Sequence, residues 1–157
     1  MNDKRSIPFS PPDMSETEIE MVAEVMKSGW ITTGPKTKEF EHLISMCCQT
    51  ARKDKDDKDL CTTVCLNSAT ACMELALRVL GIGEGDEVIV PSYTFVSTAL
   101  AFVRQGAKVI FVDSRTDSPC LDEQQLESLI TSRTRAIVPV HYAGVACDMD
   151  VVLKIAD

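Results

Sequence analysis

The chain has 157 residues, of which 45% are hydrophobic and 25% charged, and its formal net charge is −8 at pH 7. This composition is ordinary for a globular protein with a core of its own. The negative charge argues against a nucleic-acid partner, because non-specific binding needs lysine and arginine against phosphates. No apolar run approaches the roughly 20 residues that cross a bilayer, and the amino terminus lacks the apolar stretch of a signal peptide. We therefore expect a cytoplasmic protein without a membrane partner.

The first 60 residues predict an extended arm, two helices and a charged loop. Prolines at positions 8, 11 and 12 favour the arm. Residues 15–18 form a capping box, and Gly29 is a suitable end for the helix that follows. Pro35 suits the first turn of the second helix. The expected apolar face of the first helix is Ile19, Val22 and Met26, and the expected buried stripe of the second is Phe40, Leu43, Ile44 and Cys47.

Seven cysteines are present, but they form no recognisable metal or disulfide pattern. Their number is odd, and neither a C-x-x-C pair nor zinc-site spacing occurs. We predict that they are reduced and buried as small apolar residues. The charged stretch 52–59 lacks the glycine and closing glutamate of a calcium loop, so it is interpreted as a solvated loop and no metal site is expected. The cysteines are Cys47, Cys48, Cys61, Cys65, Cys72, Cys120 and Cys147.

From residue 61 onward, short β-branched runs alternate with amphipathic helices. Strands are expected at 61–66, 87–90, 108–112 and 136–140. Helices are expected at 70–80 and about 96–105, and two more begin at Asp122 and Asp148. This alternation is typical of a parallel α/β sheet. The 70–80 helix is expected to bury Met73, Ala76, Leu77 and Leu80, and the helix after Asp122 has Leu126, Leu129 and Ile130 as its apolar side.

Small polar turns follow the first two strands, and each turn begins a helix. They read SATA at residues 68–71 and PSYTFVST at 91–98. Helix amino termini bind anions through free N–H groups, and such turns hold ligands in open α/β sheets. Two further motifs are SGWITTGP at 28–35 and VPVHYAG at 138–144. Together with the two turns, these motifs resemble the DegT/DnrJ/EryC1/StrS family of pyridoxal-phosphate (PLP) sugar aminotransferases. The likeness covers most of the chain and is greatest to the branch that aminates a UDP-4-keto-pentose in lipid A modification.

The resemblance implies the amino-terminal part of the large domain of a fold-type I PLP-dependent transferase, a three-layer α/β/α fold with a mainly parallel sheet. It divides the chain into residues 1–60 and residues 61–157, the latter being the first four βα units, without the carboxyl-terminal small domain. In the full-length parent, glutamate would give its amino group to PLP and leave as 2-oxoglutarate. The resulting pyridoxamine phosphate (PMP) would aminate a keto nucleotide sugar. The resemblance also implies a homodimer that acts in polysaccharide or lipopolysaccharide biosynthesis.

The resemblance assigns cofactor-binding residues to the two turns. It places the PLP phosphate at Thr70 and Ala71 and the PLP ring against Phe95. A phosphate suits the first turn of a helix, and a flat apolar ring suits an aromatic side chain. The plain alternatives are that Ser68 or Thr70 caps its helix and that Phe95 belongs to the core.

Three more residues are candidates, and two expected groups are missing. His141 ends the fourth strand beside the same cleft, with either a structural or a catalytic role. The loop with Trp30 and Thr33 approaches the active site in the family, or packs the subunit interface. The family's pyridinium-binding aspartate and Schiff-base lysine have no match, because Asp157 and Lys154 belong to the last helix. We therefore expect the chain alone to be inactive. In the fold that the resemblance implies, the first of seven strands pairs with the seventh. Strand 61–66 is therefore expected either to belong with a missing remainder or to be displaced, for example by pairing with another chain.

Two other functions remain open at this stage. The chain can be a non-catalytic dimerising or regulatory α/β module. It can also be a flavodoxin-like binder of another phosphorylated ligand, which the βα pattern alone permits.

Overall fold

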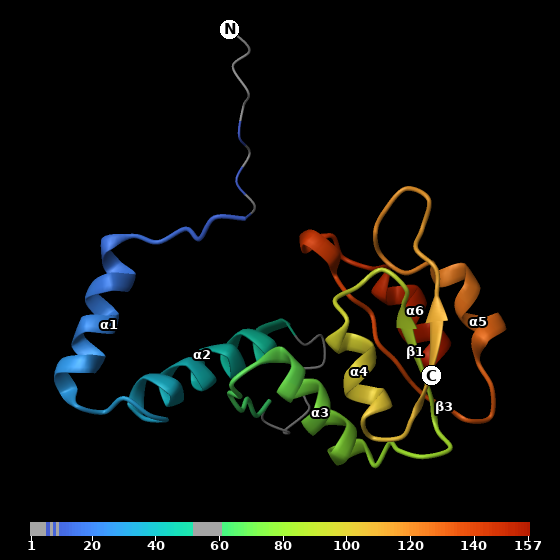
Figure 1. Ribbon diagram of the computed structural model, residues 1–157, viewed down its shortest axis with the longest axis horizontal. Coiled ribbons are helices and arrows are strands. Elements are labelled where there is room, and N and C mark those ends of the chain that lie inside the picture. The colour runs from blue at the N-terminus through green and yellow to red at the C-terminus, as the bar shows by residue number, and fades with distance from the viewer. Residues whose placement is uncertain (1–5, 7, 9, 52–60) are drawn as a thin grey trace, which may run out of the picture. The chain divides into compact units, whose positions relative to one another are not determined.

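The computed structural model describes residues 6, 8, 10–51 and 61–157 (Figure 1). The chain divides into two compact units, Met1–Cys65 and Leu66–Asp157. The predicted solvated loop at 52–59 lies outside the described residues. Among those that are described, no helix combines the length and the apolarity needed to cross a membrane.

The first unit contains two helices, α1 (Glu16–Ser28) and α2 (Pro35–Ala51). The predicted capping box is confirmed, since the Ser15 backbone N–H donates to Glu18 Oε2 over 2.7 Å and the Ser15 side chain accepts from the first turn. Gly29 ends α1 with a φ of 74°, in the left-handed region where glycine is least strained. The next helix begins at Pro35, as expected.

The apolar faces of these two helices are exposed, so the predicted buried stripe of α2 is wrong. No residue of α1 is buried, and Phe40 on α2 is 55% exposed. Helical periodicity indicates which face is apolar, but it does not say what covers that face. The apolar residues that remain exposed include Ile19, Val22, Met26, Leu43, Ile44 and Cys47.

The predicted first strand does not form. Residues 61–66 have no strand partner, and their backbone instead bonds to side chains of α2. The Thr63 N–H donates to Ser45 Oγ over 3.1 Å, and the Cys65 N–H donates to Glu41 Oε1 over 2.9 Å. The backbone N–H and C=O groups of a strand need hydrogen-bond partners, which a neighbouring strand normally provides. In this segment, polar side chains of α2 accept hydrogen bonds from the backbone instead.

The second unit is organised on a parallel sheet of three strands in the order β2-β1-β3. They are β1 (Glu87–Pro91), β2 (Lys108–Val112) and β3 (Thr134–Ile137). The last strand begins two residues before its predicted start and ends at Ile137, short of the predicted end at 140. Beyond that end, the Val138 N–H still donates to the Ile89 carbonyl of β1 over 2.9 Å. All residues of β1 are buried, as expected for the central strand of a covered sheet.

Helices cover both faces of this sheet, which gives three layers (Figure 1). On one face, α3 (Ala69–Leu80) and α4 (Ser97–Val103) pack against Val88 and Val90 of β1. On the other, α5 (Leu126–Leu129) and α6 (Met149–Ala156) pack against Ile89. Short 3-10 turns occupy η1 (Glu123–Gln125) and η2 (Tyr142–Gly144). The predicted alternation and the α/β class are confirmed.

Burial within the helices is narrower than predicted. On α3 only Leu77 is buried, while Ala76 and Leu80 are exposed. Leu126 is buried, whereas Ile130 is 39% exposed. The cysteine prediction is also wrong in part: only Cys120 and Cys147 are buried, and Cys47, Cys48 and Cys72 are exposed.

A buried carboxylate joins the amino ends of all three strands. Glu87 begins β1 and is 1% exposed. Its Oε1 accepts from Lys108 Nζ over 3.0 Å and from Arg133 Nη2 over 2.8 Å, and its Oε2 accepts from Thr131 Oγ1 over 2.6 Å. These hydrogen bonds, that of Thr131 foremost, lower the pKa of Glu87 to about 2. A buried carboxylate is tolerated here because both of its oxygens accept hydrogen bonds.

Candidate functional site at the carboxyl ends of the strands

The turns that follow β1 and β3 meet at the carboxyl edge of the sheet. Tyr93 comes two residues after β1, and Tyr142 comes five residues after β3. Their ring centroids are 4.7 Å apart, and the Tyr142 hydroxyl donates to the Tyr93 hydroxyl over 3.4 Å. This hydrogen bond raises the pKa of Tyr142. The contact fixes two ligand-competent turns relative to one another, at the edge where open α/β sheets bind ligands.

The turn after β1 presents Phe95 to solvent. Its side chain is 74% exposed, which excludes the alternative that Phe95 is a core residue of this unit. The turn is held by its own polar groups, because Thr94 Oγ1 and Thr98 Oγ1 are 3.0 Å apart and the Thr98 N–H donates to the Phe95 carbonyl over 3.0 Å. An aromatic face on a held turn is available to another flat ring.

Ser68 caps the amino terminus of α3, which confirms the alternative that a residue of this turn is a helix cap. The Ser68 side chain accepts from the Ala71 N–H over 3.1 Å. By contrast, no hydrogen bond joins the Thr70 hydroxyl to another residue that the structure describes, and Thr70 is half-buried in the first turn. The Thr70 N–H and hydroxyl are therefore the donors best placed for an anion at this helix end.

Helix α3 lies beside α4, the helix that Phe95 precedes. Met73 of α3 packs against the cluster that contains Ala101 and Phe102 of α4, and Arg104 Nη1 donates to Glu74 Oε1 over 3.1 Å. Helices α3 and α4 thus form one packed pair. That Thr70 and Phe95 border one hollow stays a prediction.

His141 follows β3 and is anchored by one of its ring nitrogens. The Cys147 N–H donates to His141 Nδ1 over 3.1 Å. A nitrogen that accepts a hydrogen bond carries no proton, so the neutral ring has its N–H at Nε2. The ring is exposed, and its neighbour Tyr142 contacts the turn after β1. His141 is thereby an oriented donor at the carboxyl edge, and a catalytic role for it stays a prediction.

A third strand end adds a carboxylate that the sequence analysis did not single out. Asp113 follows β2, and its Oδ1 accepts from the Ser114 N–H over 2.8 Å and from Ser92 Oγ over 3.4 Å. Ser92 in turn donates its backbone N–H to the Val112 carbonyl over 2.8 Å. Both the Ser92–Asp113 pair and the Tyr93–Tyr142 pair consist of polar residues that follow neighbouring parallel strands, and this position is the sequence signal by which they could be found. Which of them touch depends on the strand order.

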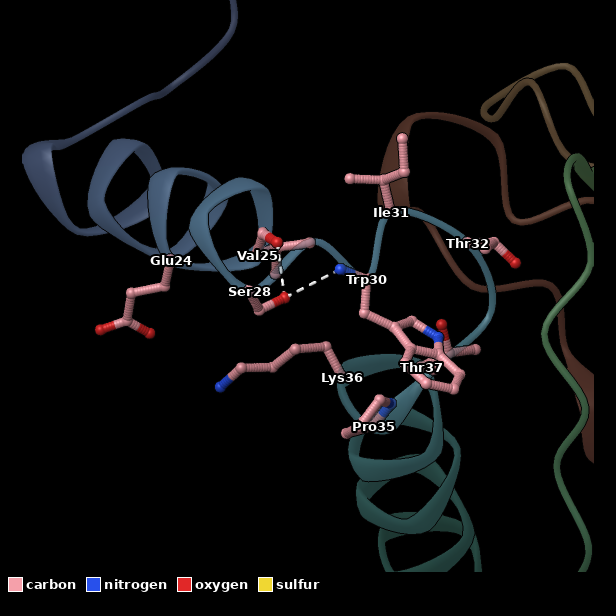
Figure 2. Close-up of a pocket in the computed structure, with 10 residues that line it drawn as sticks. Glu24, Val25, Ser28, Trp30, Ile31, Thr32, Pro35, Lys36 and Thr37 are labelled. Atoms are coloured by element: carbon pink, nitrogen blue, oxygen red, sulfur yellow. Dashed lines mark hydrogen bonds between the residues drawn. The ribbon is translucent and has the colours of Figure 1, made fainter.

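Trp30 and Thr33 lie in the first unit, in the loop between α1 and α2. Figure 2 shows Trp30 in this loop. The indole Nε1 donates to the Thr33 carbonyl over 3.0 Å, and the ring lies so close to Gly34 that a Cβ there would meet it at 2.2 Å. Ser28 holds the start of the loop by accepting from the Trp30 N–H over 3.1 Å. The loop borders a largely apolar cavity of about 500 Å³ between the two helices.

Residues 12–157 match the DegT/DnrJ/EryC1/StrS aminotransferase family. The chain is 45% identical over 151 residues to the UDP-4-amino-4-deoxy-L-arabinose–oxoglutarate aminotransferase of Shewanella sediminis. That match covers 96% of this chain and 36% of the Shewanella protein.

Solved structures are similar over the same extent. Spr1654 from Streptococcus pneumoniae in its PMP form has a TM-score of 0.82 at 46% identity, with 96% of this chain and 36% of that chain covered. NtdA from Bacillus subtilis, solved with bound PMP as cofactor, has a TM-score of 0.78 at 31% identity, with 99% and 35% covered. The chain thus spans about 36% of the length of the relatives it matches.

Proposed function

Because the chain belongs to the DegT/DnrJ/EryC1/StrS aminotransferase family, we propose that it supplies the phosphate and ring contacts of an enzyme that moves an amino group from glutamate to a keto nucleotide sugar. The family's cofactor is PLP. When bound, PLP supplies an electron sink for negative charge at the reacting carbon. The observation that carries the proposal is Phe95, whose ring stands 74% exposed at the carboxyl edge of the sheet.

The phosphate end of the cofactor is assigned to α3. The Thr70 hydroxyl and N–H donate to it, and the dipole of a 12-residue helix favours the negative charge. The Ala71 N–H joins them when Ser68 releases it.

The ring end is assigned to Phe95. The Thr94–Thr98 and Tyr93–Tyr142 contacts hold the turn on both sides of Phe95, so little side-chain freedom is lost when a second ring stacks on it. His141 presents its Nε2 edge at the same side of the sheet and is proposed to donate a hydrogen bond to the cofactor or substrate.

The sugar class and the remaining assignments also belong to the proposal. The Shewanella relative is named for a UDP-linked 4-amino sugar and for oxoglutarate, and its identity to this chain supports a UDP-4-keto sugar as acceptor. We propose that the chain alone turns over no substrate, because no lysine in it matches the family's cofactor-binding lysine. The exposed apolar faces of α1 and α2 support a homodimer, and the free thiols support a cytoplasmic location.

Calorimetric titration with PMP tests the cofactor assignment, since PMP lacks the aldehyde that labels lysines at random. We expect PMP to bind and pyridoxamine, which has no phosphate, to bind far more weakly. Thr70→Val is expected to weaken PMP binding about tenfold or more, and Phe95→Ala about threefold to tenfold. Matched controls are Thr116→Val and Phe111→Ala, because both residues are exposed in the second unit. Equal losses in the controls would contradict the assignment.

A chimaera tests the reaction. Residues 12–157 of this chain would replace the matching part of the Shewanella aminotransferase, and amino transfer from glutamate to the UDP-4-keto sugar would be followed. We expect activity in the chimaera and none in the chain alone. A folded chimaera that binds PMP without transferring the amino group would contradict the proposed reaction, and binding of inorganic phosphate without PMP would favour a different phosphorylated ligand.

A further inference from the structure

Two buried thiols lie together on the face of the sheet opposite α3 and α4. Cys120 and Cys147 are 1% and 5% exposed and belong to one apolar cluster. Each thiol is oriented by a backbone carbonyl: Cys120 Sγ donates to Val145 over 3.2 Å, and Cys147 Sγ donates to Val140 over 3.4 Å. Val145 lies only two residues before Cys147, so the Cys120 thiol is anchored to the same loop that carries the second thiol.

The two thiols share access to solvent through one cavity. A space of about 260 Å³ is lined by both cysteines and by a charged rim. In that rim, Arg115 Nε donates to Asp117 over 2.8 Å and its Nη1 donates to Glu123 over 3.1 Å. The guanidinium is therefore already neutralised by carboxylates and gives little stabilisation to a thiolate. A small, uncharged oxidant fits this opening.

The surroundings of Cys147 slow its reaction with an oxidant. Burial raises the pKa of the Cys147 thiol, and its contact with Cys120 raises it further. Since the thiolate is the reactive form, oxidation at neutral pH is expected to be slower here than at the exposed cysteines.

One hydrogen bond connects this pair to the carboxyl edge of the sheet. The backbone N–H of Cys147 donates to His141 Nδ1 over 3.1 Å. A movement of the Cys147 backbone toward Cys120 changes the length or direction of that bond. The chemical state of the thiols is thus linked to the imidazole ring of His141.

We propose that Cys120 and Cys147 form an oxidisable dithiol pair whose closure to a disulfide changes the hydrogen bonding of His141. With hydrogen peroxide, one thiolate sulfur attacks a peroxide oxygen and the O–O bond breaks. This leaves a sulfenic acid, and the released hydroxide takes up the thiol's proton to become water. The second sulfur then attacks the first, the S–S bond forms, and the S–O bond breaks. The hydroxyl leaves as water with the second thiol's proton, so two thiols are oxidised and peroxide is reduced to two waters.

Mass spectrometry of a chain with its other five cysteines changed to serine tests the closure. We expect peroxide to remove about 2 Da, the mass of two hydrogens, and trypsin to release residues 116–133 linked to residues 136–154. Cys120→Ser and Cys147→Ser in this background are expected to abolish the linked peptide. The wild-type chain, with its exposed thiols first alkylated under native conditions, repeats the test without relying on the fold of the variant.

Proton NMR tests the link to the histidine. The chain has only two histidines, His42 and His141, so their ring signals are readily separated. We expect oxidation to shift the His141 signal and leave that of His42 unchanged. A disulfide with an unmoved His141 signal would overturn the link.

Phenylarsine oxide gives a second measure of proximity, because the arsenic bridges two neighbouring thiols with loss of one water. In the chain with its other five cysteines changed to serine, we expect one arsenic per chain, resistant to glutathione and released by a dithiol. The absence of both the linked peptide and the arsenic adduct would overturn the pair. Neither readout depends on whether the chain binds PLP.

Discussion

The attachment of α3 to the sheet depends on one buried leucine, and this makes a sharp prediction. Leu77 is 1% exposed and is the only buried residue of α3. Leu77→Ala removes three carbons from the cluster that contains Val88, Val90 and Phe102. The transfer of these carbons to water costs about 2.4 kcal/mol at roughly 0.8 kcal/mol each, and the cavity left behind adds to this. The total expected cost is about 3–5 kcal/mol, as for other core leucines.

Leu75 provides the matched control on the same helix. It is 43% exposed, so Leu75→Ala loses only part of the transfer energy and leaves no enclosed cavity. We expect a cost of about 1 kcal/mol. Helix propensity is nearly the same for both variants, because each exchanges leucine for alanine inside α3.

Urea unfolding followed by circular dichroism measures both variants. Hydrogen exchange at the α3 amides adds a local readout, in which Leu77→Ala is expected to lower protection along α3 well before β1 is affected. An equal loss of stability in the two variants would refute the reasoning. It would mean that the outer face of α3 is as covered as its inner face.

Three further predictions concern single side chains. Glu87 is paired with Arg133 and has a folded pKa of about 2, below its ordinary value. Its ionised form therefore stabilises the fold fully above about pH 4.5 and progressively less as the pH falls toward 2. Over that window, the urea concentration at the unfolding midpoint should fall more steeply with pH in the wild type than in Glu87→Gln. Gly34→Ala places a Cβ 2.2 Å from the indole of Trp30, so the fluorescence of this single tryptophan should shift while the second unit's stability is unchanged. Ser68→Ala removes the cap of α3 and should cost about 1 kcal/mol in urea unfolding.

Local signals predicted most of the second unit. The helix now seen as α3 was expected one residue shorter, and β2 was expected at its observed bounds. Such elements are specified by neighbours in sequence, through hydrophobic period, capping residues and glycine stops. Gly81, for example, ends α3 with a φ of 65°, a conformation that glycine adopts without strain.

Features that depend on distant partners were missed. Residues 61–66 have a strand-like composition, but Glu41 and Ser45 of α2 compete for their backbone. The apolar residues of α2 form one face of the helix, as predicted, but that face is exposed and not buried. Periodicity does not reveal what packs against an apolar face. Non-local pairing of this kind is set by the whole fold.

The candidate site shows the same division. Turn residues such as Thr70 and Phe95 could be found from the two strand-turn-helix patterns, since each turn begins a helix. The contact between Tyr93 and Tyr142 could not, because it joins residues 49 positions apart. It follows from the strand order β2-β1-β3, which brings the ends of β1 and β3 side by side. Residue composition and spacing do not predict that strand order.

Stability and binding compete for one N–H at the start of α3. The Ala71 N–H is satisfied by Ser68 Oγ in the chain, yet it is also one of the donors assigned to a phosphate. A charged acceptor forms a stronger hydrogen bond than a hydroxyl, so a phosphate can displace Ser68 and regain the energy of the cap. The Ser68→Ala change should therefore weaken the fold without weakening PMP binding. If binding instead falls in parallel with stability, then Ser68 itself contacts the ligand and the phosphate site begins two residues before Thr70.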